Sequence, residues 1–295
     1  MIPLSTRRWK CYDLCSMKTI KLTILAAINQ LVSSQNINEV LSQYSQLSSL
    51  TSIITNSSAL FTQLEAANNF TFLAPSNDAI ATWTRSPSSN TSIDILLTYH
   101  LLTGSLLLSP PVKGWYNVSI FMSSALNDTR YTNVTGGQRV EFLFDGQAKF
   151  QSGDKTTSII TAADIISTGG IIHIIDTVLE IPLNSLREAS AARLEYFDEV
   201  FTSGYFLHPE NAAESALANL PSERNQSQVN VLLEYHIVIG LYYSSDFING
   251  STLNTTAGVP ILVTIDNDGD IYLNAAKITT PDYLVSNGVM HVIDR

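Results

Sequence analysis

Two copies of one α+β domain are the fold that the sequence predicts, on three observations. Three segments recur in the same order, helical patterns precede strand patterns in the first copy, and 45% of the 295 residues are hydrophobic against 14% charged. This composition supports packed cores and argues against global disorder. The length fits about two domains, which we expect at residues 35–183 and 184–295.

The repeat consists of three pairs of matching segments. The first pair shares F-L-x-P-x-N-x-A, the second shares L-L-x-Y-H-h-h-x-G (h is apolar), and the third ends in G-h-h-H-h-I-D. The pairs span residues 72–79 and 206–213, 96–104 and 232–240, and 164–176 and 282–294. Repetition in a fixed order predicts a repeated structural unit.

Helices are expected first in the chain. Apolar residues recur at helical spacing between residues 36 and 68, at Val40, Leu41, Leu47, Leu50, Ile53 and Ile54. A short helix should follow Pro75, because Ser76 and Asn77 can cap a first turn. The run from Leu96 to Leu102 predicts either a helix end or a strand entry, stopped at Gly104.

Strands are expected in the remainder of each copy. The segment Phe70 to Leu73 predicts a strand, and a last strand should run from Ile171 to Leu179. Asp145-Gly146 and Asp268-Gly269 each separate two β-prone runs, which is a strong hairpin signal because tight turns need positive φ. Helices followed by strands predict an α+β domain.

Residues 1–34 resemble an N-terminal extension followed by a signal peptide. Lys18 and Lys21 precede a short apolar run, and small residues follow at Ser33 and Ser34. This order of basic, apolar and small residues is typical of secretory signals. An ordinary amphipathic helix is the alternative, and translation can start at Met1 or Met17.

Acceptor sequences for N-linked glycans are more frequent than the composition would give by chance. The N-x-S/T pattern begins at Asn56, Asn69, Asn90, Asn117, Asn127, Asn133, Asn225, Asn249 and Asn254. Glycans are attached in the secretory pathway, so we expect a secreted or cell-surface glycoprotein.

Charge and cysteine content exclude several classes of partner. The net charge of -10 disfavours nucleic acid and anionic lipid. The only cysteines, Cys11 and Cys15, precede the predicted domains, which therefore contain neither a disulfide nor a thiolate metal site. No stretch is long and apolar enough to predict a transmembrane helix.

No motif predicts catalysis, a cofactor or a metal. The sequence contains no nucleophile elbow, no Walker loop and no G-x-G-x-x-G pattern. His100, His173, His236 and His291 recur at equivalent positions inside apolar runs, which favours hydrogen-bonded structural histidines. The acidic run from Asp266 to Asp270 fails as a calcium loop, because Ala275 stands where the terminal glutamate is needed.

The three segments resemble the signature blocks of the fasciclin (FAS1) domain family. Thr71 to Ala79 is similar to its first block, Tyr99-His100 to its middle mark and Gly170 to Leu179 to its closing block. The resemblance covers nearly all of residues 35–295. It implies, for each copy, a wedge or sandwich of strands with helices packed on one side, and a role in cell adhesion or matrix interaction.

The resemblance also implies candidate partner-binding residues, which in animal relatives are linked to integrin binding. They are Tyr99, His100, Asp164, Ile165, Tyr235 and His236. The second copy has Asp282-Tyr283 where the first has Asp164-Ile165. Expected partners are surface or matrix proteins or glycans. The alternatives are a vacuolar or endomembrane lumenal protein acting in membrane traffic or fusion, and a polysaccharide-binding module.

The second copy departs from the pattern at two places. It is shorter before Phe206, near Gly204, and the sequence stops at Arg295 before a counterpart of Val178 to Pro182. We therefore expect an incomplete second domain that lacks its last strand. Such a loss would leave a sheet edge unpaired.

Overall fold

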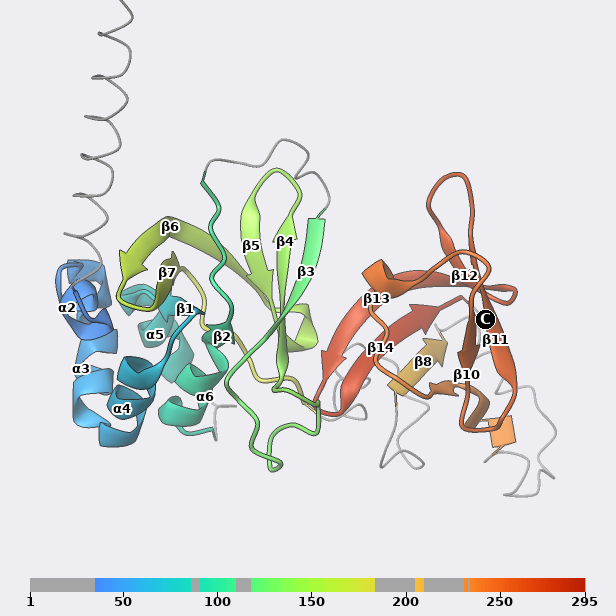
Figure 1. The fold of residues 1–295 in the computed structure, drawn as a ribbon, viewed down its shortest axis with the longest axis horizontal. Coiled ribbons are helices and arrows are strands. Elements are labelled where there is room, and N and C mark those ends of the chain that lie inside the picture. Colours follow the sequence, from blue (N-terminus) through green and yellow to red (C-terminus); the bar gives the residue numbers. More distant parts are fainter. Residues whose placement is uncertain are drawn as a thin grey trace, which may run out of the picture.

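The computed structural model describes six parts of the chain. They are residues 35–85, 91–109, 118–183, 205–209, 231–232 and 234–294, with 205–209 described by backbone alone. Two groups of strands lie side by side along the long axis of the molecule, and the helices gather on the first (Figure 1). The extension and signal peptide predicted for 1–34 fall outside the described residues, as does the shortening near Gly204.

The two groups are seven-stranded sheets with one topology. The first sheet has the order β2 (Leu101–Thr103), β1 (Phe70–Pro75), β7 (Gly170–Ile175), β6 (Thr157–Ser167), β5 (Ala148–Gln151), β4 (Arg139–Phe144) and β3 (Val118–Ser123). The second has the order β9 (Ile237–Val238), β8 (Tyr205–Pro209), β14 (Gly288–Ile293), β13 (Ala276–Val285), β12 (Ile271–Leu273), β11 (Pro260–Ile265) and β10 (Thr252–Asn254). Each holds one parallel pair, β1 with β7 and β8 with β14. The predicted repeat is thus a repeat of topology.

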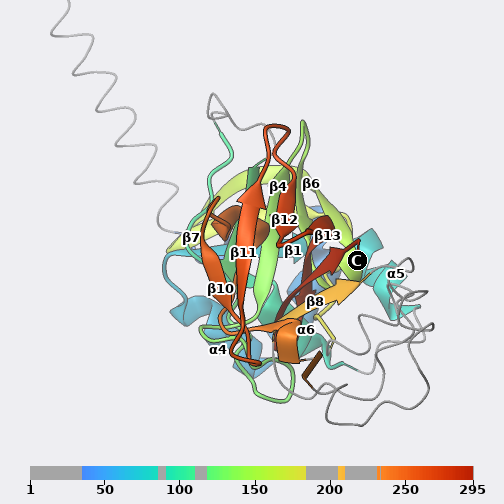
Figure 2. The same ribbon diagram turned by 90° about the vertical axis from the view of Figure 1, so that its right-hand side faces the viewer.

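Each sheet curls until its two outer strands meet. In the first copy Leu102 faces Ser124, and the amide of Ala125 donates to Leu101 O at 2.7 Å. In the second copy the amide of Ile239 donates to Asn254 O at 2.8 Å. Figure 2 shows the strands of the second copy from the side, in front of the first copy. Closure pairs backbone groups that an open edge would leave exposed.

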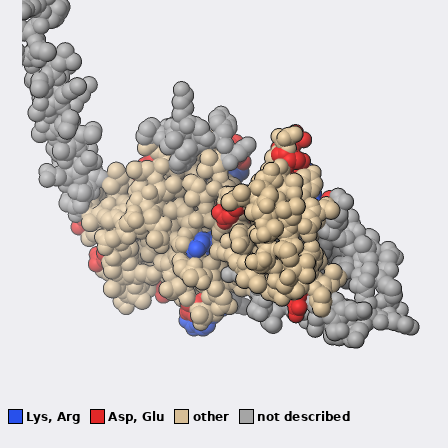
Figure 3. Space-filling model, turned by 45° about the vertical axis from the view of Figure 1, so that its right-hand side comes forward, with Lys and Arg blue, Asp and Glu red and all other residues tan. Residues whose placement is uncertain are grey.

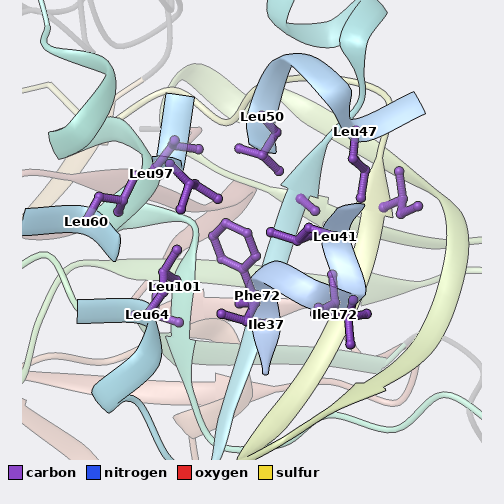
Figure 4. Packing of buried hydrophobic residues seen from close by; sticks show 14 of the residues in the cluster. Ile37, Leu41, Leu47, Leu50, Leu60, Leu64, Phe72, Leu97, Leu101 and Ile172 are labelled. Atoms are coloured by element: carbon purple, nitrogen blue, oxygen red, sulfur yellow. The ribbon is translucent and has the colours of Figure 1, made fainter. Parts of the chain in front are cut away.

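A layer of short helices covers β1 and β7 of the first sheet. It consists of α2 (Ile37–Ser42), η1 (Ser45–Leu47), α3 (Ser48–Asn56), α4 (Ser58–Ala66), α5 (Asn77–Thr84) and α6 (Ile93–Tyr99). Figure 4 shows Phe72 of β1 surrounded by leucine and isoleucine side chains from this layer and from β7. The apolar spacing seen between 36 and 68 is therefore the core-facing side of these helices.

Side-chain caps set where the helices begin. Asn36 and Glu39 form a reciprocal capping box at the start of α2. Ser76 caps α5 by accepting from the amide of Ala79, as predicted. Asn77 does not cap this helix, because its Oδ1 accepts from the amide of Ser49 at 2.9 Å. It thereby joins α5 to α3.

Strand β1 is buried on both of its faces, because the helices cover one face and a second core lies against the other. Phe72 and Ala74 point to the helices, whereas Leu73 belongs to the core between β4, β5 and β7. In that second core Phe142 pairs across the strands with Phe150, with ring centroids 5.4 Å apart. Val263 and Leu273 form the equivalent pair in the second copy.

The hairpins and the first strand agree with the sequence, but the closing strand does not. Both Asp-Gly hairpins form, and the run from Leu96 to Leu102 is a helix end followed by a strand entry. The last strand stops at Ile175, so the expectation of a strand to Leu179 was wrong. Since the outer strands of the first sheet are β2 and β3, the predicted bare edge does not follow from losing this segment.

Candidate partner-binding site

Tyr99 and His100 end α6 inside the core of the first copy, and neither side chain has exposed area. The Tyr99 hydroxyl donates to Arg139 O at 2.7 Å. The amide of Leu179 donates to His100 Nε2 at 3.0 Å, so the ring proton is on Nδ1, which donates to Leu96 O at 2.7 Å. Burial lowers the pKa of His100 to about 4. In this conformation the pair joins three parts of the fold and offers no contact surface.

Asp164 interrupts strand β6 and holds the loop after β2. Its backbone is left-handed, with φ of 57°, where the register of β6 against β7 shifts. Its amide donates to His173 Nδ1 at 3.1 Å, and its carboxylate accepts from the amide of Leu108 at 2.9 Å. His173 Nε2 then donates to Leu106 O at 3.0 Å. We call this arrangement the Asp–His clamp.

The same clamp recurs in the second copy. Asp282 has φ of 62°, and its amide donates to His291 Nδ1 at 3.3 Å. Its carboxylate accepts from the amide and the hydroxyl of Ser244, and His291 Nε2 donates to Tyr242 O at 2.9 Å. Burial lowers the pKa of His291, which leaves the ring neutral at pH 7, so its 3.9 Å approach to the carboxylate of Asp282 is no ion pair. The recurring aspartates and histidines fix loops.

Tyr235 and His236 differ from their first-copy counterparts in exposure, since both are only half buried. His236 Nδ1 donates to Leu232 O at 2.8 Å, repeating the bond inside α6. The Tyr235 hydroxyl accepts from Asn274 Nδ2 at 2.6 Å. This pair therefore has both a structural anchor and accessible atoms.

Two exposed apolar residues flank Asp164, and sequence reasoning missed them. Leu107 precedes the loop residue that Asp164 holds, and Ile166 follows Asp164 on β6, with 52% and 45% of their surface exposed. Asp164 and Ile165 are themselves half buried. A single exposed leucine or isoleucine carries no periodic signal in sequence. We call Leu107, Asp164, Ile165 and Ile166 the bulge patch.

The described glycan acceptors all lie at the surface. They are Asn56, Asn69, Asn127, Asn133, Asn249 and Asn254. Asn249 uses Oδ1 to accept from the amide of Ile265 at 3.0 Å, which leaves its amide nitrogen for a glycan. Asn90, Asn117 and Asn225 fall outside the described residues.

Neither a metal cluster nor a membrane span occurs in the part of the chain that the structure describes. No three histidine, cysteine or acidic side chains there converge as metal ligands. No helix within the same residues is long and apolar enough to cross a bilayer. The rings of His100, His173 and His291 use both nitrogens on backbone groups.

Two copies of one closed seven-stranded unit, each fastened by the same clamp, define a tandem-repeat protein. The family model of the fasciclin domain matches residues 45–182 and 198–295. The chain therefore belongs to the fasciclin domain family.

Similar proteins occur in fungi and animals. The chain is 27% identical over 288 residues to a fasciclin-like arabinogalactan protein of Arthroderma benhamiae, covering 88% of this chain and 66% of the relative. It is 25% identical to the fasciclin-like arabinogalactan protein CTB11 of Cercospora beticola, over 92% of this chain and 79% of the relative. Human periostin is also 25% identical, over 81% of this chain but 29% of periostin. A FAS1 domain pair from the insect cell adhesion molecule fasciclin I aligns at a TM-score of 0.38 and 19% identity, covering 82% of this chain and 93% of that one.

Proposed function

We propose that this protein is a secreted or cell-surface glycoprotein whose tandem fasciclin domains mediate adhesion or association with the cell wall or matrix. The observation that carries the proposal is the match of the fasciclin domain in two regions of the chain. Relatives named fasciclin-like arabinogalactan protein and periostin support an adhesion-type or wall-associated role. Surface placement of the described glycan acceptors supports passage through the secretory pathway.

The bulge patch is the contact surface that we propose for the first copy. Exposed apolar area beside a polar side chain suits a protein partner. Tyr99 and His100 are buried and add no area to this surface, while Tyr235 and His236 are half exposed and can contact a partner directly in the second copy.

Binding without catalysis is the role we propose, with no cofactor. The family is of adhesion type, and the buried histidines of both clamps are committed to backbone hydrogen bonds. A vacuolar role has no support among the reported relatives, and binding to wall polysaccharide is an outcome that the experiment must separate.

Expression of the tagged full-length protein in a eukaryotic host tests the proposal. We expect the protein in the medium or at the cell surface, with a mass that falls on treatment with peptide N-glycosidase. Unglycosylated protein retained in the cytosol would contradict it. Pull-down on wall polysaccharide, beside binding to intact cells with and without protease treatment, separates a glycan ligand from a protein partner.

Ile166→Asp tests the bulge patch, and Ile248→Asp is its control. Both are exposed isoleucines, with 45% and 69% of their surface exposed, but Ile248 lies in the second copy. We expect the first variant to lose cell or matrix binding and the second to retain it. Equal losses, or none in either variant, would remove the bulge patch from the proposal.

A further inference from the structure

The two copies contact each other through two parts of the first copy, which are β3 with the segment that follows it and the η2 loop between β5 and β6. Gln138 Nε2 donates to Val285 O at 3.1 Å, and the amide of Asn133 donates to Ser286 O at 2.7 Å. The rings of Phe121 and Tyr243 stack with centroids 3.8 Å apart. Apolar stacking and backbone hydrogen bonds are features of a specific interface.

A lysine with an unusual backbone lies at this contact. Asp154 and Lys155 form the end of η2 (Gly153–Lys155), and both are left-handed, with φ of 52° and 53°. Residues with a Cβ seldom adopt this conformation, which persists only where the surroundings enforce it. Their backbone position places the Lys155 ammonium against the second copy.

Lys155 interacts with both copies at once. Its Nζ lies 3.8 Å from Glu141 Oε2 in the first copy and 5.3 Å from the centroid of the Tyr283 ring in the second. A cation over an aromatic face is attracted by the ring quadrupole. The charge of Asp282 also favours the protonated lysine from the second copy. The lysine thus bridges the interface.

Glu141 depends on this lysine. Its carboxylate is almost fully buried, Oε1 accepts from the Ser119 hydroxyl at 2.6 Å, and Oε2 has no hydrogen-bond partner. Burial raises the pKa of Glu141, and the carboxylate of Asp282 raises it further, whereas Lys155 opposes the rise. Burial likewise lowers the pKa of Lys155. Lys155 is therefore the cation paired with Glu141, while the charge of Asp282 acts on both groups from the second copy and His291 beside Asp282 stays neutral.

We propose that Lys155 is an interdomain latch that holds the two fasciclin domains as one rigid unit, with Glu141 as its contact in the first copy and the Tyr283 ring as its contact in the second. The described residues carry few charges on the face drawn in Figure 3, and 14% of all residues are charged. If the two domains are held together, the bulge patch of the first copy and the Tyr235-His236 pair of the second keep one fixed distance and orientation. This inference stands whether or not the adhesive function holds.

Distance measurement between spin labels on the full chain tests the latch. Labels are attached at Thr62→Cys in α4 and Thr264→Cys in β11, both exposed, after Cys11 and Cys15 are changed to serine. We expect a narrow distance distribution for the otherwise native chain. Lys155→Met removes the charge and keeps the length of the side chain, and we expect it to broaden the distribution.

Lys149→Met is the matched control. Lys149 pairs with Asp145 inside the first copy at 2.6 Å, and its side chain is 24% exposed against 23% for Lys155. The control should keep the narrow distribution. A broad distribution in the native chain, or equal widths for the two lysine variants, would overturn the latch.

Tyr283→Leu tests the latch from the second copy, and it provides an independent measurement if Lys155→Met fails to fold. We expect the same broadening, with an unchanged far-ultraviolet circular dichroism spectrum. Combining Tyr283→Leu with Lys155→Met should add little further width, because both remove one contact. Full additivity of the two effects would refute a shared latch.

Discussion

The Tyr-His pair of the first copy is wholly buried, whereas the same pair in the second copy is half exposed. His100 is enclosed on one side by α6 and on the other by the segment after β7, whose Leu179 amide donates to Nε2. His236 repeats the bond to the helix, through Leu232 O. One motif therefore occurs with two exposures.

The Asp–His clamp, unlike the Tyr-His pair, is nearly identical in the two copies. Asp164 and Asp282 both adopt a left-handed backbone, and His173 and His291 both bridge an aspartate amide to a loop carbonyl. The repeated motif residues are therefore needed for backbone geometry, and their accessibility to a partner depends on what packs over them.

The largest difference between the copies should appear in their cores. Phe142→Ala empties part of a fully buried aromatic pair and should lower the free energy of unfolding by about 3–5 kcal/mol. Val263→Ala, at the equivalent buried position, removes two methylene equivalents and should cost roughly 2 kcal/mol. Urea unfolding monitored by circular dichroism measures both.

Leu107→Ala is the control for these core variants. Leu107 is exposed, so the free energy of unfolding of this variant should stay within about 0.5 kcal/mol of the native value. If Val263→Ala lost as much stability as Phe142→Ala, the two cores would not differ in the way that the aromatic pair implies.

The buried His100 should make the first copy sensitive to acid. Burial lowers its pKa from 6.5 to about 4. Between these two values His100 is protonated in the unfolded chain but neutral in the folded chain. The stabilisation is complete above pH 6.5 and is lost as the pH falls towards 4, by at most about 3 kcal/mol. Unfolding measured across this interval should be less steep in pH for His100→Asn than for the native chain.

Leu97→Val separates titration from packing. Leu97 is buried in α6, three residues before His100, and cannot titrate, so this change should lower the free energy of unfolding by the same amount at every pH. An unchanged pH slope in His100→Asn would show that His100 is not the source of acid sensitivity.

Local signals in the sequence predicted the local parts of this fold. Ser76 caps α5 because a side-chain oxygen next to a helical run needs no distant partner. The burial of Tyr99 depends on Arg139, forty positions away, and the extent of β7 depends on pairing with β1 and β6. Such contacts leave no periodic pattern. Asp154 and Lys155 adopt a left-handed backbone although neither is glycine. The sequence therefore did not predict this turn or the contact that Lys155 makes with the second copy.

The smallest expected effect lies in the hairpins, where the copies differ in turn length. The first copy turns within Asp145 to Gln147, while the second uses a longer loop in which Asp266 Oδ1 accepts from the amides of Asp268 and Asp270 at 3.0 and 2.9 Å. Asp266→Ala should therefore destabilise the β11–β12 hairpin by about 1 kcal/mol. Asp268→Ala should change little, because Asp268 contributes its amide rather than its side chain to these bonds. Hydrogen exchange at Thr264 and Tyr272 measures the opening of this hairpin, and equal exchange in the two variants would mean that Asp266 does not hold the longer turn.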